Sequence, residues 1–172
     1  MDYKDLVGAI KRYGSSERDI CRAILGLPPE KISERVILAP WWEADVMPAL
    51  GKASYLKASY ADDSIRIWDV ENGSSHITYI KTGVGAPVLM DAVLALGITP
   101  CRRAVFVGSV GALDGNIAIG DIVVPEYSVS GDGASRYISA DSLRRDSFGS
   151  KAYPDKALNG ALLSNAREIC AQ

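Results

Sequence analysis

The succession of strand, helix and strand between residues 76 and 111 constrains the fold of this chain more than any other feature. His76–Ile80 is strand-like, Val88–Leu96 has apolar residues at helical spacing, and Ala104–Val107 is an apolar run typical of a fully buried strand. This order indicates a crossover between two parallel strands. We therefore predict a three-layer α/β fold in which helices flank both sides of a mixed, mostly parallel central sheet.

Three more strand-like runs precede this crossover, at Arg35–Ala39, Tyr55–Tyr60 and Ile65–Val70. Pro40 ends the first of them, and its β-branched apolar residues favour a central strand. The Asn72-Gly73 pair favours a hairpin before His76. These runs extend the predicted sheet on the N-terminal side of the crossover.

Residues 1–34 are predicted to form a helical preface to the sheet. Apolar residues recur at helical spacing from Tyr3 to Tyr13, ahead of Gly14. A second helix is expected at about residues 17–25, with Ser15 or Ser16 as its cap.

The chain after residue 107 is predicted to contain a strand at Asp121–Pro125, a long surface loop at Ser130–Ser150 and a helix at Lys156–Cys170. We expect residues 1–172 to form one domain, because this length builds one substantial core and requires no second.

The composition excludes several classes of protein. Hydrophobic residues make up 48 % and charged residues 23 % of the chain, which is typical of a folded globular protein. The net charge of −2 gives no electrostatic reason to expect a nucleic-acid partner. Neither a signal peptide nor a membrane span is visible.

The three cysteines, Cys21, Cys101 and Cys170, lie far apart in the sequence. We therefore expect neither a metal site nor disulfides, and we expect a cytoplasmic location.

Two glycine-rich turns follow successive predicted strands and are the candidate ligand-binding segments. Ligands of an open parallel sheet bind where its strands end. Glycines there let backbone amides approach an anion or a sugar closely, and a serine adds a hydroxyl donor. The alternative is that the glycines serve only to make tight turns. The candidate binding residues are Gly83, Gly85, Gly108, Ser109 and Gly111.

Two other classes of site fit these turns poorly. A dinucleotide-binding fold needs Gly-x-Gly-x-x-Gly at the start of a helix after the first strand, and neither turn supplies it. A nucleophile elbow needs Gly-x-Ser-x-Gly, whereas Gly108 here directly precedes Ser109.

Four sequence blocks between Ile77 and Ile138 are informative when taken together. They are Thr82-Gly83-Val84-Gly85, Gly108-Ser109-Val110-Gly111-Ala112-Leu113, Ile119-Gly120-Asp121-Ile122-Val123-Val124-Pro125 and Gly131-Asp132-Gly133-Ala134-Ser135. In this order and at these separations they resemble the nucleoside phosphorylase superfamily, which includes purine and uridine phosphorylases and the methylthioadenosine and S-adenosylhomocysteine nucleosidases. The last block looks most like the uridine phosphorylase branch.

The resemblance implies an enzyme that cleaves the N-glycosidic bond of a purine or pyrimidine nucleoside, with no cofactor and with phosphate as a candidate co-substrate. It also implies a homo-oligomer, either a dimer or a hexamer. Asp132 and Ser135 are placed in a loop near the site, although capping and turn formation explain them equally well. The resemblance ends about two thirds of the way through a typical member, so we expect the chain to stop before the site is complete.

Two departures from the family concern phosphate. The phosphorylases carry Gly-Asp-Pro-x-Arg after the first strand, where this chain has Ala39-Pro40-Trp41-Trp42-Glu43, and Phe106 stands where a second arginine is usual. An acid and an aromatic ring disfavour a dianion. Family nucleosidases keep a water-activating acid near this place, so Glu43 is the candidate catalytic residue. Its alternative is a solvated acid at a helix N-terminus.

Two functions therefore remain open. The first is a nucleoside phosphorylase or nucleosidase. The second is a non-catalytic, truncated family member that binds a nucleoside or acts by association.

Overall fold

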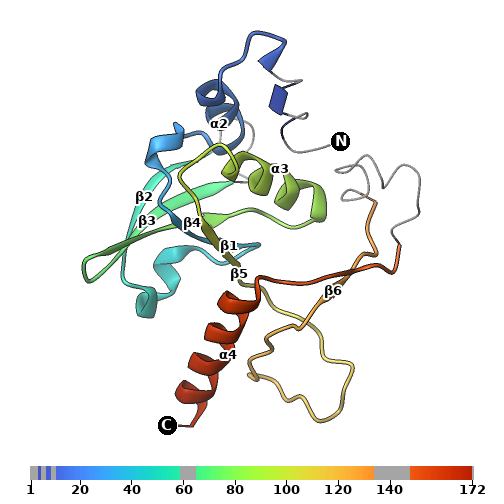
Figure 1. Ribbon diagram of the computed structural model, residues 1–172. Helices are drawn as coiled ribbons and strands as arrows, with labels where there is room; N and C mark the ends of the chain where they lie inside the picture. The colour runs from blue at the N-terminus through green and yellow to red at the C-terminus, as the bar shows by residue number, and fades with distance from the viewer. Residues whose placement is uncertain (1–3, 5–6, 9–10, 59–64, 134–147, 172) are drawn as a thin grey trace.

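A computed structural model of the chain describes residues 4, 7–8, 11–58, 65–133 and 148–171 (Figure 1). The helix predicted from Tyr3 to Tyr13 lies partly outside these residues. The elements, with η for a 3-10 helix, are α2 (Glu17–Leu25), η1 (Pro29–Lys31), β1 (Arg35–Ala39), η2 (Ala44–Val46), η3 (Pro48–Leu50), β2 (Lys52–Ala58), β3 (Arg66–Asn72), β4 (Ser75–Lys81), α3 (Ala86–Leu96), β5 (Arg103–Phe106), β6 (Ser128–Val129), β7 (Lys151–Ala152) and α4 (Lys156–Cys170).

Five of the strands form one mixed sheet in the order β2-β3-β4-β1-β5. β1 pairs in parallel with β4 and β5, whereas β3 pairs antiparallel with β2 and β4. The predicted α/β fold with a mixed sheet is confirmed, but the described sheet is not mostly parallel, because its antiparallel pairings are as many as its parallel ones. Helix α3 connects β4 to β5, which pair in parallel with β1 on its two sides. The tight turn at Gly73 joins β3 to β4 in the antiparallel part, and its φ of 59° suits glycine.

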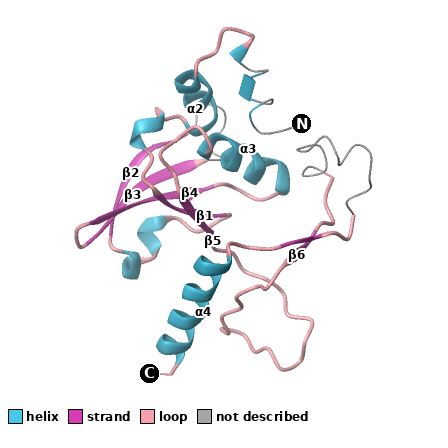
Figure 2. Ribbon diagram, in the orientation of Figure 1, coloured by secondary structure: helices cyan, strands magenta, loops and turns pink. Residues whose placement is uncertain are grey.

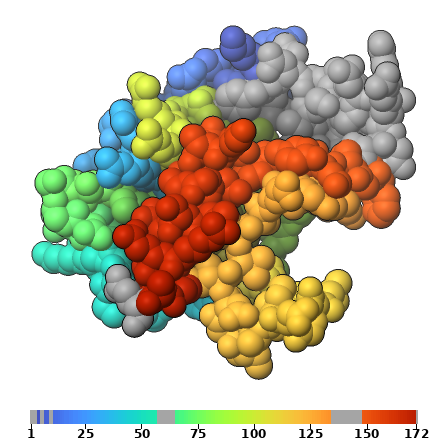
Figure 3. All heavy atoms as spheres, turned by 60° about the horizontal axis from the view of Figure 1, so that its bottom comes forward, coloured from blue at the N-terminus to red at the C-terminus, as the bar shows by residue number. Residues whose placement is uncertain are grey.

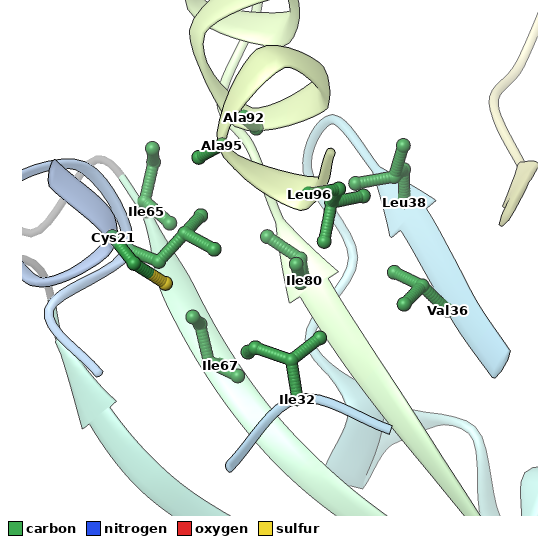
Figure 4. Close-up of a cluster of buried hydrophobic side chains, with 11 residues drawn as sticks. Cys21, Ile32, Val36, Leu38, Ile65, Ile67, Ile80, Ala92, Ala95 and Leu96 are labelled. Atoms are coloured by element: carbon green, nitrogen blue, oxygen red, sulfur yellow. The ribbon is translucent and has the colours of Figure 1, made fainter. Parts of the chain in front are cut away.

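One face of the sheet is covered by α2 and α3 (Figure 1). Ser16, one of the two serines expected as the cap, caps α2 in a reciprocal arrangement with Asp19, and Gly26 ends the helix at φ 70°. Figure 4 shows side chains of both helices directed toward aliphatic side chains of β1, β3 and β4. This aliphatic cluster contains Cys21, Leu25, Ile32, Val36, Leu38, Ile65, Ile67, Ile80, Ala92, Ala95 and Leu96.

The opposite face is covered by η2 and η3 and carries an aromatic cluster. The ring centroids of Trp68 and Tyr79 lie 5.9 Å apart, and Tyr55 lies 5.3 Å from Trp68, in edge-on arrangements. Short 3-10 turns therefore take the place of α-helices in the third layer around the described sheet.

The chain after β5 is much less buried. The prediction of a fully buried strand at Ala104–Val107 is wrong in its burial, because β5 is the outermost strand and Ala104 and Phe106 are exposed. The strand predicted at Asp121–Pro125 does not form, because no strand lies beside it within the described residues. Figure 2 shows loop from β5 to β6.

The helix predicted at Lys156–Cys170 is confirmed as α4, but none of its residues is buried. In the space-filling view α4, in red, lies beside the yellow and orange chain that follows β5 (Figure 3). Of the helices in the described ranges, none is long and apolar enough to cross a membrane.

Candidate functional site

The carboxyl ends of three parallel strands meet at one edge of the sheet. Ala39, the last residue of β1, lies opposite Lys81 of β4, and Leu38 lies opposite Phe106 of β5. The amide of Thr82 donates to the Ala39 carbonyl at 2.8 Å, and that of Val107 donates to the Leu38 carbonyl at 2.8 Å. The loops that follow these strands are therefore neighbours, with the loop after β1 in the middle. This edge is where ligands of open α/β sheets bind.

The first glycine turn is fixed by its backbone. Gly83 has φ 79° and Gly85 has φ 121°, both in the region that favours glycine. The buried Thr82 hydroxyl lies 3.3 Å from the Ala39 carbonyl and 3.0 Å from the Gly83 carbonyl, so it holds the turn against β1. Gly85 is the N-cap of α3 and supplies no side-chain cap. Both glycines are thus required by conformation, whether or not they also contact a ligand.

The second glycine turn begins beside the loop after β1. A Cβ atom at Gly108 would lie 3.1 Å from Phe106 Cε1 and 3.9 Å from Pro40 Cγ. Ser109 is exposed, and its hydroxyl makes no hydrogen bond within the described part of the chain. Gly111 is also exposed, and a Cβ atom there would meet no other atom of the described chain within 4 Å. Ser109 is therefore open to a ligand at this edge.

Glu43 lies between two cations. Its Oε1 accepts hydrogen bonds from Arg66 Nη1 at 2.7 Å and from Lys81 Nζ at 3.0 Å. Arg66 and Lys81 are directly opposite each other on β3 and β4, where like charges repel. By strand alternation they share the face of Trp68 and Tyr79. We call Glu43, Arg66 and Lys81 the charged cluster.

The cluster is partly shielded from water, since the side chains of Glu43 and Lys81 are 30 % and 24 % exposed. The hydrogen bond from Lys81, together with the charges of Lys81 and Arg66, lowers the pKa of Glu43 below its ordinary value of 4.5. Glu43 is therefore a carboxylate at neutral pH. A carboxylate of this kind accepts hydrogen bonds, but it is a weak base and not a proton donor.

The loop that carries Glu43 is held in place by the aromatic cluster. The Tyr79 hydroxyl donates to the Trp42 carbonyl at 3.0 Å, and Pro40 is buried. The rings of Trp41 and Trp42 meet edge-on with centroids 6.1 Å apart, and residue Trp41 is 43 % exposed. The position of Glu43 is thus set by the sheet beneath it.

The sequence-predicted residues are only partly brought together. Glu43, Gly83, Gly85, Gly108 and Ser109 come from the three neighbouring loops. Asp132 lies in the chain after β6, and Ser135 lies outside the described residues.

Sequence reasoning missed Arg66 and Lys81. The signal was available, since each stands two residues from an aromatic residue on the same strand face, Trp68 or Tyr79. A charge on an inward face needs a counter-charge, and Glu43 supplies it.

A cavity of about 300 Å³ lies at the other end of β1 and β4, away from the glycine turns. None of the predicted site residues lines it. In the described ranges, no group of three or more His, Cys, Asp or Glu residues could hold a metal ion. The cavity is lined by Ser33, Glu34, Arg35, Ser74, Ser75 and His76.

The family model for the phosphorylase superfamily matches residues 37–172 of this chain. Among curated proteins, no sequence matches it significantly.

The solved structures that are similar to this chain also include phosphorylases. A uridine phosphorylase from Vibrio fischeri, complexed with 6-hydroxy-1-naphthoic acid, is 28 % identical, with a TM-score of 0.62 over 78 % of this chain and 54 % of its own. A purine nucleoside phosphorylase from Toxoplasma gondii, in complex with immucillin-H, is 22 % identical, with a TM-score of 0.70 over 83 % of this chain and 55 % of its own. This chain thus spans about half the length of the structures it resembles.

Proposed function

This chain belongs to the phosphorylase superfamily, and from that premise we propose that it acts on nucleosides by cleaving the N-glycosidic bond between base and ribose. The observation that carries the proposal is the meeting of the loops after β1, β4 and β5 at one sheet edge, with both glycine turns and the exposed Ser109. The similar solved structures are named as uridine and purine nucleoside phosphorylases, which supports a nucleoside as the substrate class.

The residues at this edge suit the charge that develops in such a reaction. As the bond from the sugar to the base nitrogen breaks, the ribose gains oxocarbenium-like positive charge and the base takes the electron pair. Ser109 and the amides of the glycine turns are donors for the incoming nucleophile or the ribose hydroxyls. The Glu43 carboxylate is the candidate group to orient an attacking water, whose oxygen forms the new bond to the anomeric carbon of the ribose. A proton from this water balances the reaction by ending on the released base.

We propose hydrolysis over phosphorolysis. Phe106 and Glu43 stand at the two places where the family holds phosphate with arginine, and Arg66 and Lys81 are already engaged by Glu43. A free dianion would have to displace this carboxylate. Water needs no such displacement.

Release of free base from uridine, inosine and methylthioadenosine tests the proposal. We expect turnover of at least one nucleoside at equal rates in phosphate and in phosphate-free buffer of the same ionic strength. The Ser109→Ala variant should be slower, whereas Ser164→Ala on α4 should match the unchanged chain. A strict phosphate requirement contradicts hydrolysis, and no turnover of any nucleoside contradicts the enzymatic function.

The second candidate is a nucleoside-binding module without turnover. The observation that favours it is the exposure of the whole segment Gly108–Gly111, because a catalytic serine needs a fixed position. Calorimetric binding of a nucleoside with no base released would support this candidate.

We further propose a homo-oligomer in the cytoplasm. Exposed apolar side chains after β5, such as Val110, Leu113 and Ile119, support association because contiguous apolar surface tends to be buried. The free state of all three cysteines supports a reducing compartment. Light scattering at several concentrations tests the assembly, and a chain that stays monomeric contradicts it.

A further inference from the structure

The charged cluster places two cations and one carboxylate on the sheet face beside the phosphorylase-type edge. Arg66 and Lys81 are cross-strand partners, and both donate to the same oxygen of Glu43. Lys81 directly precedes Thr82 and the first glycine turn. Positive charge is therefore present at the candidate site, although the arginines usual in the family are not.

We propose that Glu43 is a built-in anion that occupies Lys81 and Arg66 and so closes this edge to phosphate and other tetrahedral oxyanions. The inference deepens the proposed function and rests on it, because it names the residue that decides between phosphate and water at the same site.

The geometry supports a permanent contact between Glu43 and the cations. The loop from Pro40 to Glu43 is short, starts at the end of β1 and is held by the bond from Tyr79 to Trp42. A carboxylate tethered in this way has an effective concentration on the order of millimolar or higher. Free phosphate at a similar concentration therefore does not displace the Glu43 carboxylate from Lys81 and Arg66.

The charge balance shows what the removal of Glu43 would do. Glu43 supplies one negative charge to the contact with Arg66 and Lys81. Glutamine in place of Glu43 removes that charge and leaves a weaker acceptor for the Lys81 hydrogen bond. A tetrahedral oxyanion has the charge and the acceptor oxygens to take the position of the carboxylate.

The test compares the unchanged chain with Glu43→Gln by titration calorimetry with inorganic phosphate and with sulfate, at an ionic strength held constant with sodium chloride. We expect E43Q to bind both anions about tenfold more tightly or better, because one negative charge has left the contact shell. The double variant E43Q/K81Q should lose this gain. Glu30→Gln is the matched control, since Glu30 pairs with Arg18 at 2.6 Å on the surface, and it should gain nothing.

Equal phosphate affinity in the unchanged chain and in E43Q would overturn the inference. If circular dichroism shows that E43Q is unfolded, phosphate binding is compared between the unchanged chain and Lys81→Met, both of which keep Glu43. Weaker phosphate binding in Lys81→Met would show that Lys81 already binds phosphate and would overturn the inference. Equal, weak phosphate binding in the two chains supports it. Nucleoside turnover does not enter these measurements. A chain without base release can therefore still gain anion binding in E43Q, and failure of the proposed function is separable from failure of this inference.

Discussion

Residues 17–106 and residues 107–171 differ in what their apolar side chains contact. Within the described ranges, every residue of the buried core belongs to the first region, from Ile20 to Leu96. The second region is also rich in apolar residues, but Val110, Leu113 and Ile119 are 76 %, 105 % and 107 % exposed. Apolar composition alone therefore does not produce burial, which also requires a facing surface at the right place.

The candidate site crosses the boundary between these regions. Glu43, Gly83 and Gly85 are held by β1, β4 and α3, whereas Ser109 and Gly111 belong to an exposed loop. Catalysis depends on groups that are already oriented before the reaction. One half of the candidate site thus has fixed geometry within the chain, and the other half depends on what orders the segment after β5.

The largest expected difference between the regions is the cost of removing an isoleucine side chain. Ile80 is fully buried and Ile119 is fully exposed. We expect Ile80→Ala to lower the free energy of unfolding by about 2–5 kcal/mol, through lost burial and the cavity left behind. Ile119→Ala should change it by less than about 0.5 kcal/mol. Urea denaturation followed by circular dichroism measures both, and equal losses would show that the second region is packed as tightly as the first.

The same comparison explains which elements the sequence predicts. The bounds of β1 follow from a β-branched run before Pro40. A serine cap on α2 follows from the serine pair before an amphipathic segment, and the structure shows that Ser16 is the capping residue. The run Asp121–Pro125 carries the same kind of local signal and forms no strand, because strand formation also needs a partner edge. Local patterns contain no information about that partner.

The site follows the same rule. The meeting of the two glycine turns at one edge is predictable, because parallel strands bring their carboxyl ends together. The charged cluster is not, because it depends on the register that sets Arg66 opposite Lys81 and on the fold of the loop that brings Glu43 between them. The apolar residues of β5 predict its burial, and this prediction fails because the strand is at the sheet edge.

An intermediate effect is expected from glycine substitutions in the two regions. Gly51 has φ 127°, and a Cβ atom there would lie 2.1 Å from the Glu71 carbonyl oxygen. We expect Gly51→Ala to cost about 1–3 kcal/mol of the free energy of unfolding, from the strained φ and from the backbone shift that relieves the overlap with Glu71. A Cβ atom at Gly111 would meet no other atom of the described residues within 4 Å, so Gly111→Ala should be close to neutral. Thermal unfolding of the two variants checks this, and a loss at Gly111 comparable to that at Gly51 would contradict the open geometry of the second turn.

The smallest effect is expected from the removal of helix caps. In the first region it should lower the free energy of unfolding, and in the second it should change only the helical signal. Ser16 Oγ accepts from the Asp19 amide at 3.2 Å, and Asp155 Oδ1 accepts from the Leu158 amide at 2.8 Å. Ser16→Ala should lower the free energy of unfolding by about 1 kcal/mol, because α2 buries Ile20, Cys21 and Leu25 in the core. Asp155→Ala should reduce the far-ultraviolet helical signal of α4 and leave the main unfolding transition unchanged, because α4 buries none of its residues.

The pH dependence of the Ser16 variant separates the cap from other causes. Hydrogen bonds from the side chain and the backbone of Ser16 lower the pKa of Asp19 below its ordinary value of 3.8. A carboxylate with a depressed pKa stabilises the folded state above its unfolded pKa and loses that contribution as the pH falls through its folded pKa. The stability gap between the unchanged chain and Ser16→Ala should therefore be constant near neutral pH and narrow below about pH 3.8. Denaturant titrations at neutral and acidic pH measure the gap, and a gap that stays constant into acid would show that Asp19 takes no part in the cap.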